Sequence, residues 1–244
     1  MVKSRTGAIS AEWARYKTFL KRPKVTGDAL PPSASGLAAV FRMLGLDLIV
    51  MIVLLGLVGL AIASGFEPPS NQLDGIELDM RMVLLIVLVA PVLEEIFFRG
   101  WLSGKLSHVL AVIALLGVFA TGAAGAVSGG ESGSVPVAPL AALVLLALAA
   151  FALWHFRKRK PMGWFARLFP VFFWLSSIGF ALIHLLNYTE GSLAMLLPLV
   201  LPQFAIGTML GYVRVNYGLW ASMLLHALHN ATFTALIAFG TLAG

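Results

Sequence analysis

Three short segments of this sequence carry side chains that can transfer protons or donate hydrogen bonds, at spacings that suit one face of a helix. The segments are EEIFFR (Glu94 to Arg99), FALIHLLN (Phe180 to Asn187) and HALHN (His226 to Asn230). Together they provide carboxylates, an arginine, imidazoles and amides, which are groups that catalyse proton transfer and meet developing charge. All three lie in apolar runs, where an ionised side chain costs roughly 2.5 to 3.5 kcal/mol and is usually paired and functional.

The two carboxylates of the first segment are predicted to have different roles. Residues four positions apart lie on the same face of a helix, whereas adjacent residues diverge by about 100°. We therefore expect Glu95 and Arg99 to form a buried ion pair that fixes the helix. Glu94 points elsewhere and has no local cation, and a carboxylate in a low-dielectric site is a better base near neutral pH. Glu94 is thus the predicted general base.

The imidazoles and amides must be weighed against a purely structural role. His226 and Asn230 are four residues apart, so both can face one cavity, while His229 lies about 60° to the other side of His226. A lone histidine or asparagine in a membrane helix more often makes an interhelical hydrogen bond than a catalytic site. For Asn187 and His229 that interpretation is at least as good as a functional one, and Asp47 is best explained by helix packing.

The elements that position these residues are predicted to be membrane-spanning helices. Of the 244 residues, 59% are hydrophobic and 11% are charged, whereas about a quarter are charged in soluble domains. A spanning helix needs about 20 mostly apolar residues. Seven runs qualify or nearly do: 43–64, 82–104, 108–127, 138–156, 170–188, 192–213 and 218–240. We therefore expect an all-α fold, a polytopic transmembrane helical bundle of about seven spans. Glu94, His184 and His226 then lie on three different spans, which is difficult to explain as packing.

Composition also limits the chemistry and the partners. The chain has no cysteine, which excludes disulfides, Cys-ligated zinc and thiol nucleophiles. The net charge of +6 comes from basic residues that flank apolar runs, so the expected partner is the lipid bilayer and not nucleic acid. Residues 1–40 are predicted to be a basic cytosolic arm and residues 41–244 the transmembrane bundle, with no second domain.

The orientation follows from the distribution of Lys and Arg, which are enriched in short cytoplasmic loops. With seven spans and the N-terminus inside, almost all Lys and Arg residues fall on the inside, and only Arg81 falls outside. Six of the eleven acids then lie outside. We therefore expect a multi-pass protein of the plasma (inner) membrane with a cytosolic N-terminus and an outside C-terminus.

The three segments resemble the motif regions of the CPBP family, which includes the type 2 CAAX prenyl proteases and bacteriocin-processing intramembrane proteases. The family pattern is EExxxR, then FxxxH, then HxxxN. It is matched in order by PVLEEIFFRG, FALIHLLN and the end of LPQFAIGTMLGYVRVNYGLWASMLLHALHN. The resemblance covers about residues 82–235, which we expect to form the protease core. Any one motif is weak, but three in order, each in an apolar run, are specific.

The resemblance implies an endopeptidase that hydrolyses peptide bonds of membrane-embedded or lipid-anchored substrates, of which prenylated CAAX proteins are the best-known case. By position, Glu94 would activate water, His184 would help to hold it, and His226 with Asn230 would stabilise the oxyanion. The supporting residues would be Glu95, Arg99 and Asn187.

Two features depart from the family pattern. Glu94 and His184 are separated by 90 positions, with the predicted spans 108–127 and 138–156 between them. The predicted boundaries also place Glu94 and His226 roughly 8 to 12 Å from the cytosolic boundary and His184 nearer to 20 Å, at 1.5 Å per residue.

The metal requirement and two other functions are left as alternatives. Members of the family are often called metalloproteases, and if zinc is bound, His184 and His226 with Glu94 would bind it. The zinc signature HExxH is absent, so we expect that no cofactor is required. The other functions are a proton-coupled transporter, in which the same residues form a relay, and a catalytically silent immunity or scaffold relative. Only the span 192–213 has enough Gly and Pro to suggest the broken helices of transporters.

Overall fold

The computed structural model describes residues 5–25, 31–72, 75–127 and 137–243. These residues form helices and no strand, apart from one isolated bridge between Asn71 and Tyr188. The α-helices are α1 (Arg5–Lys21), α2 (Ala34–Ala63), α3 (Met80–Leu84), α4 (Ala90–Arg99), α5 (Leu106–Val127), α6 (Val137–His155), α7 (Gly163–Ile183), α8 (Leu193–Leu196), α9 (Leu201–Tyr217) and α10 (Leu219–Ala243). A π-helix, η1 (Leu85–Val89), joins α3 to α4, and 3-10 turns follow as η2 (Gly100–Ser103), η3 (His184–Asn187) and η4 (Leu197–Val200). The all-α prediction is confirmed.

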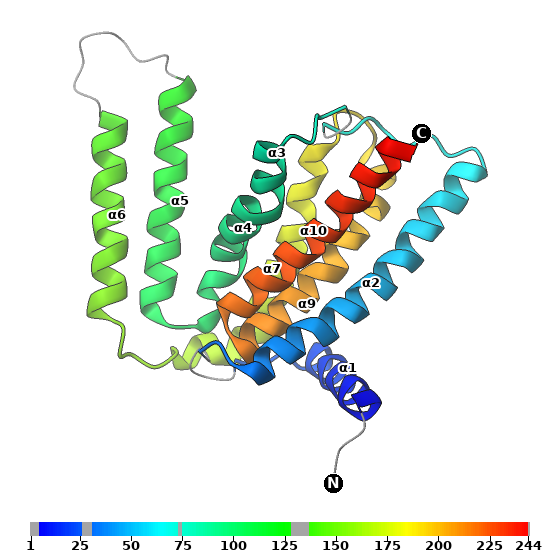
Figure 1. Cartoon of the computed structure of the whole chain (residues 1–244). Coiled ribbons are helices and arrows are strands. Elements are labelled where there is room, and N and C mark those ends of the chain that lie inside the picture. Colours follow the sequence, from blue (N-terminus) through cyan, green and yellow to red (C-terminus); the bar gives the residue numbers. More distant parts are fainter. Residues whose placement is uncertain (1–4, 26–30, 73–74, 128–136, 244) are drawn as a thin grey trace.

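Six helices in the described ranges are long and apolar enough to cross a membrane. They are Ala34–Ala63, Leu106–Ala124, Ala138–His155, Gly163–Asn187, Leu193–Tyr217 and Leu219–Phe239. The predicted span 82–104 is not one regular helix but consists of α3, η1 and α4, which run beside α10 (Figure 1). Counting this interrupted segment, the chain has about seven spans, as predicted.

The interruption has a chemical cause in the sequence. Within η1 the Ala90 amide donates to the Leu85 carbonyl, five residues earlier. The next donor in this pattern would be residue 91, which is proline and has no N–H. The carbonyl of Ile86 therefore loses the donor that would continue the π-helix. Such π-turns are frequent at functional sites, and this one leads directly into the helix of Glu94 and Glu95.

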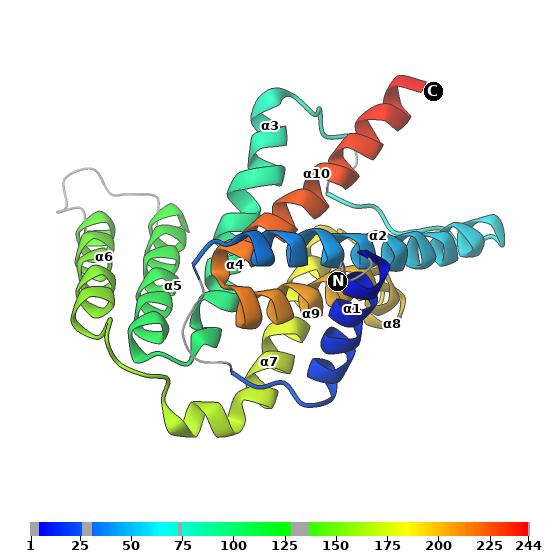
Figure 2. The same cartoon turned by 60° about the horizontal axis from the view of Figure 1, so that its bottom comes forward.

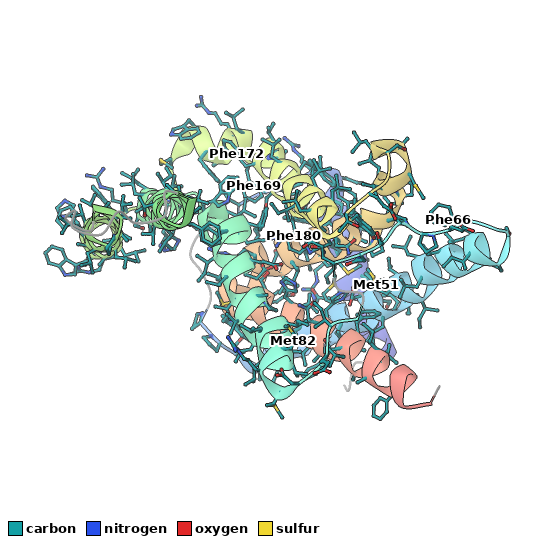
Figure 3. The ribbon with its side chains drawn as sticks, turned by 90° about the horizontal axis from the view of Figure 1, so that it is seen from above. Met51, Phe66, Met82, Phe169, Phe172 and Phe180 are labelled. Atoms are coloured by element: carbon teal, nitrogen blue, oxygen red, sulfur yellow. The ribbon has the colours of Figure 1, made fainter. Side chains whose placement is uncertain are left out.

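Helix α9 is the centre against which α2, α7 and α10 pack. The face of α9 towards α7 has no side chain at two positions one turn apart, Gly207 and Gly211. A Cβ atom at Gly207 would be 3.1 Å from the ring of Phe180, and one at Gly211 would be 2.7 Å from the ring of Phe173. Small residues let membrane helices approach closely, so the two glycines bring α7 and its phenylalanines onto α9. Figure 3 looks down the bundle and shows Phe180 near its middle.

Helix α7 begins earlier than the predicted span, at Gly163, and contains Pro170. Proline removes a hydrogen bond and kinks a helix. Figure 2 shows the first part of α7 lying at an angle to the rest, along the end of the bundle. The residues before Pro170 therefore lengthen α7 along the end of the bundle.

Helices α5 and α6 form the extra pair that was predicted between the first two motifs. They pack on each other as a hairpin at one side of the bundle (Figure 1), where Gly117 of α5 lies against Leu145 of α6. The hairpin meets the bundle near η2 and α4, for example through the rings of Phe97 and Phe119, whose centroids are 6.1 Å apart. A hairpin returns the chain to the end that it left, so α7 enters in the direction that the motifs require.

Candidate active site

Glu95 lies at the centre of a fully buried polar cluster. Its Oε1 accepts a hydrogen bond from Arg99 Nη1 at 2.9 Å and lies 3.0 Å from His226 Nδ1. The Ser222 hydroxyl donates to Oε2. Neither Glu95 nor Arg99 is exposed at all, so the predicted ion pair is present. With three partners on its two oxygens, Glu95 is stabilised as a carboxylate and is poorly placed to act as a base.

Arg99 is held from two further sides. Its Nη2 reaches the Gly207 carbonyl of α9 at 3.4 Å, and its Cζ lies 3.9 Å from the centre of the Phe180 ring. The absence of a side chain at Gly207 permits this approach, because a Cβ there would lie 3.3 Å from Nη2. The guanidinium is thus compensated by a carboxylate, a carbonyl and an aromatic face, which a buried arginine requires.

Two residues of this cluster were missed by the sequence reasoning, Ser222 and Arg214. Ser222 is four residues before His226, so helical spacing places both on the face of α10 that meets Glu95. Arg214 is buried in α9 and donates from Nε and Nη2 to the carbonyls of Arg99 and Gly100, at 3.1 and 3.3 Å. It satisfies carbonyls at the end of α4. Arg214 lies between the predicted spans 192–213 and 218–240, so apolar content did not indicate its burial.

Glu94 lies on the other side of the same imidazole. Its Oε2 is 3.7 Å from His226 Nε2, and this oxygen is buried without a hydrogen-bond partner among the described residues. The Glu94 side chain as a whole is 31% exposed, whereas that of Glu95 is completely buried. His226 therefore lies between two carboxylates, with Nδ1 towards Glu95 and Nε2 towards Glu94. Because an ionised carboxylate only accepts, Nδ1 carries the proton that is shared with Glu95.

His184 reaches this cluster through Phe180. The carbonyl of Phe180 can only accept, so His184 Nδ1 donates to it, at 2.7 Å. The Phe180 ring centroid lies 4.8 Å from that of His184 and 5.6 Å from that of His226. The rings of His184 and His226 therefore both contact the ring of Phe180.

Asn230 contacts the π-helix and not the carboxylates. Its Nδ2 donates to the Ile86 carbonyl at 2.8 Å, which is the carbonyl left without a donor by Pro91. One side-chain N–H of Asn230 thus replaces the backbone donor that the Ile86 carbonyl lacks. The second side-chain N–H can donate to another acceptor. The asparagine has a structural task whether or not it also has a catalytic one.

The remaining polar residues of the motifs lie outside the cluster. His229 Nδ1 is 2.7 Å from Oδ2 of Asp47, which is fully buried in α2, so this pair joins α10 to α2. Asn187 ends η3 and is half-buried, and its backbone carbonyl accepts from the amide of Gln72 at 2.7 Å. The structure therefore brings Glu94, Glu95, Arg99 and His226 together directly, His184 through Phe180, and Asn230 through η1.

The donor set does not fit a metal ion. Within the described residues, no three His, Cys, Asp or Glu side chains are grouped so that they could hold one. The imidazole of His226 has its Nδ1 engaged by Glu95, and the Arg99 guanidinium lies against the same carboxylate. The ligands expected if zinc is bound, His184 and His226 with Glu94, are not grouped as a metal site among the described residues. No catalytic step is assigned to a metal.

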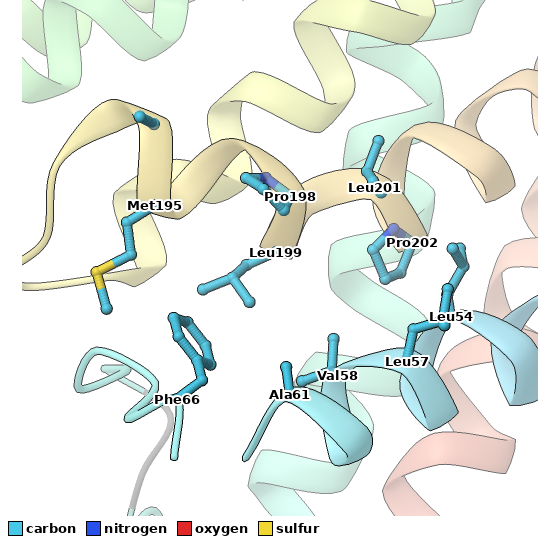
Figure 4. A pocket seen from close by; sticks show the side chains of 11 residues that line it. Leu54, Leu57, Val58, Ala61, Phe66, Met195, Pro198, Leu199, Leu201 and Pro202 are labelled. Carbon is cyan, nitrogen blue, oxygen red and sulfur yellow. The ribbon is translucent and has the colours of Figure 1, made fainter. Parts of the chain in front are cut away.

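An apolar cavity lies away from this chemistry. It has a volume of about 410 Å³ and lies between α2 and the segment from α8 to α9 (Figure 4). Leu54, Val58, Phe66, Pro198 and Pro202 are among its lining residues, none of which is ionisable. The cavity can accept hydrocarbon but contributes nothing to proton transfer.

A comparison with known families locates the same region of the chain. The family model of the type II CAAX prenyl endopeptidases, Rce1-like, matches residues 77–232. This segment contains the polar cluster on α4, α7, α9 and α10, and also the α5–α6 hairpin. No curated protein and no solved structure matches the chain. The match covers more than half of the sequence and agrees with the resemblance of the three motifs, so the chain belongs to the Rce1-like family of type II CAAX prenyl endopeptidases.

Proposed function

We propose that this protein is an intramembrane endopeptidase in which Glu94 activates water for attack on a peptide bond of a lipid-anchored substrate. The observation that carries the proposal is the contrast between two adjacent acids. Glu95 has three partners, whereas Glu94 Oε2 is buried with no hydrogen-bond partner in the described part of the chain and faces His226 Nε2 at 3.7 Å. A carboxylate with a free, sheltered oxygen is available to accept a proton.

In the proposed reaction the attacking water lies between Glu94 and the imidazoles. Because His184 donates from Nδ1 to the Phe180 carbonyl, its Nε2 presents a lone pair that can accept a hydrogen bond from the water. The water oxygen bonds to the scissile carbonyl carbon while its proton passes to Glu94. The C–N bond then breaks, and Glu94 returns the proton to the leaving nitrogen. The products are a carboxylate and an amine.

The negative charge that develops on the carbonyl oxygen requires hydrogen-bond donors. We assign this task to His226, which donates from Nε2 when that nitrogen carries a proton, and to the second amide proton of Asn230. Glu95 orients the His226 ring because its carboxylate lies 3.0 Å from Nδ1. Arg99 and Ser222 hold Glu95 in this position, so they act through it and not on the substrate.

The proposal can be tested with purified protein in lipid nanodiscs and two peptides of the same sequence, one farnesylated at a C-terminal CAAX cysteine and one unmodified. We expect cleavage of the farnesylated peptide, with one atom of ¹⁸O from labelled water in the new carboxylate. The isosteric change Glu94→Gln should lower the rate by about 10²- to 10⁴-fold. Glu77→Gln removes an exposed acid outside the cluster and serves as the matched control.

A different experimental result would contradict each part of the proposal: the role of Glu94, the recognition of the prenyl group and the peptidase activity itself. Full activity of Glu94→Gln would exclude Glu94 as the base. Equal cleavage of both peptides would retain the endopeptidase but exclude prenyl recognition. If no peptide is cleaved and the reconstituted protein instead carries a proton current that Glu94→Gln removes, the transporter alternative is correct.

A further inference from the structure

Helix α1 lies outside the residues that the family model matches, yet it places a buried carboxylate at the end of the bundle. Glu12 is not exposed at all. Its Oε1 accepts hydrogen bonds from the hydroxyls of Tyr212 and Tyr217, each at 2.7 Å. Its Oε2 pairs with Arg15 at 2.6 Å and with Arg42 at 3.5 Å. Four donors from three helices thus converge on one side chain.

Other contacts of α1 reach the same part of α9. The Tyr16 hydroxyl lies 2.6 Å from that of Thr208, and Tyr16 is buried. Burial raises the pKa of Tyr16 to about 12, although the hydrogen bond with Thr208 lowers it, so the hydroxyl remains neutral. The ring of Phe19 meets those of Phe173 and Tyr212, with centroids 5.1 and 5.3 Å away. Figure 1 shows α1 lying across the end of the bundle below α9.

The contacts of α1 alternate along α9 with the contacts of the polar cluster. Thr208, Tyr212 and Tyr217 bind α1. At neighbouring positions, the Gly207 carbonyl accepts from Arg99, the Leu210 carbonyl lies 3.0 Å from the Ser222 hydroxyl, and Arg214 donates to α4. The contacts with α1 and the contacts with the polar cluster are made by the same stretch of α9. The axial position and the rotation of this stretch therefore determine the geometry of both groups of contacts.

We propose that Glu12 is a positioning residue for the active site and that it acts through α9. Its two partners on α9, Tyr212 and Tyr217, hold the stretch from Gly207 to Tyr217 in the register in which the Gly207 and Leu210 carbonyls contact Arg99 and Ser222. These two residues hold Glu95, and Glu95 orients His226. The assignment rests on the proposed function for its catalytic readout, but the orientation of His226 can be measured without a substrate.

The matched variants are Glu12→Gln and Lys17→Gln, which remove one charge each from α1. Glu12→Gln keeps the shape of the buried side chain but replaces an acceptor of four donors by an amide. Lys17 is exposed on the same helix. We expect Glu12→Gln to lower kcat by about 10- to 100-fold with little change in KM, because small displacements of catalytic groups have such effects. Lys17→Gln should leave both constants unchanged.

Rates are measured per folded molecule, at a temperature well below the unfolding midpoint of every variant. Tyr212→Phe and Tyr217→Phe each remove one donor and should give intermediate losses of kcat. Combined with Glu12→Gln they should cost little more, because partners in one network are not additive. In parallel, the ¹⁵N resonance of the His226 ring should move in Glu12→Gln and stay in place in Lys17→Gln.

The outcomes separate this proposal from the proposed function. If wild-type protein cleaves no peptide, the proposed function fails, and the His226 resonance alone decides the role of Glu12. If wild-type protein cleaves and Glu12→Gln has a lower unfolding midpoint but an unchanged kcat and an unchanged His226 resonance, Glu12 is only structural and the proposal is overturned.

Discussion

Glu94 and Glu95 are chemically identical neighbours whose surroundings give them different capacities. A helix turns by about 100° per residue, which directs Glu95 to Arg99, Ser222 and His226 and leaves Glu94 at the edge of the cluster. The cation therefore compensates one acid and not the other. Removing the cation should damage the fold, whereas neutralising the unpaired acid should damage only the chemistry.

We accordingly predict that Arg99→Met destabilises the protein by about 3 to 5 kcal/mol, because it leaves Glu95 as a buried, uncompensated charge. Glu94→Gln should change stability much less. Thermal unfolding in detergent, followed by circular dichroism, measures both. The double variant Glu95→Gln/Arg99→Met removes the stranded charge and should recover part of the loss. Equal unfolding midpoints for Arg99→Met and Glu94→Gln would contradict the pairing.

The two tasks assigned to Asn230 can be separated by changing a proline. Asn230→Ala leaves the Ile86 carbonyl without its donor and should cost about 1 to 3 kcal/mol. Pro91→Ala restores a backbone N–H at the position from which a helix would supply that donor. We expect Asn230→Ala/Pro91→Ala to regain stability but not peptide cleavage. Recovery of both would mean that Asn230 acts only by completing the backbone.

At the scale of the helices, α9 supports the site because its two glycines leave the backbone open to side chains from neighbouring helices. Gly207 and Gly211 let the rings of Phe180 and Phe173 approach its backbone, and Arg99 reaches the Gly207 carbonyl. We predict that Gly211→Ala lowers stability by about 1 to 3 kcal/mol, because its Cβ would lie 2.7 Å from the buried ring of Phe173. Gly56→Ala in α2, where nothing lies within 4 Å, is the control and should not lower the unfolding midpoint. Similar midpoints for the two variants would exclude close packing at Gly211.

Spacing predicted those parts of the site that depend on one helix. The Glu95–Arg99 pair and the separation of Glu94 from it follow from positions four and one residues apart. Contacts between helices could not be derived in this way, because no local pattern specifies that Ser222 meets Glu95 or that Asn230 meets Ile86. The span 82–104 was predicted as one helix because apolar content gives length but not regularity. Pro91 was the only sign of its π-turn.

At the scale of the molecule, the charges are divided between the two ends of the bundle. Helix α1, the start of α2 and the α6–α7 connection lie at one end, and the connection before α3 lies at the other (Figure 1). The basic run from Arg157 to Lys160 is at the α1 end, whereas Glu67, Glu77 and Asp79 are in the connection between α2 and α3. This division is what the positive-inside rule uses, so we expect the α1 end to face the cytosol.

Because the sequence contains no cysteine, single cysteines can report the orientation without background. Glu77→Cys and Lys160→Cys place exposed thiols at opposite ends of the bundle. A membrane-impermeant maleimide should label Glu77→Cys in intact spheroplasts and Lys160→Cys only after permeabilisation. The reverse pattern would place α1 outside. The buried cluster would then have to take its substrates from the outer face, where the cytosolic carboxyl-terminal tail of a prenylated protein could not reach Glu94.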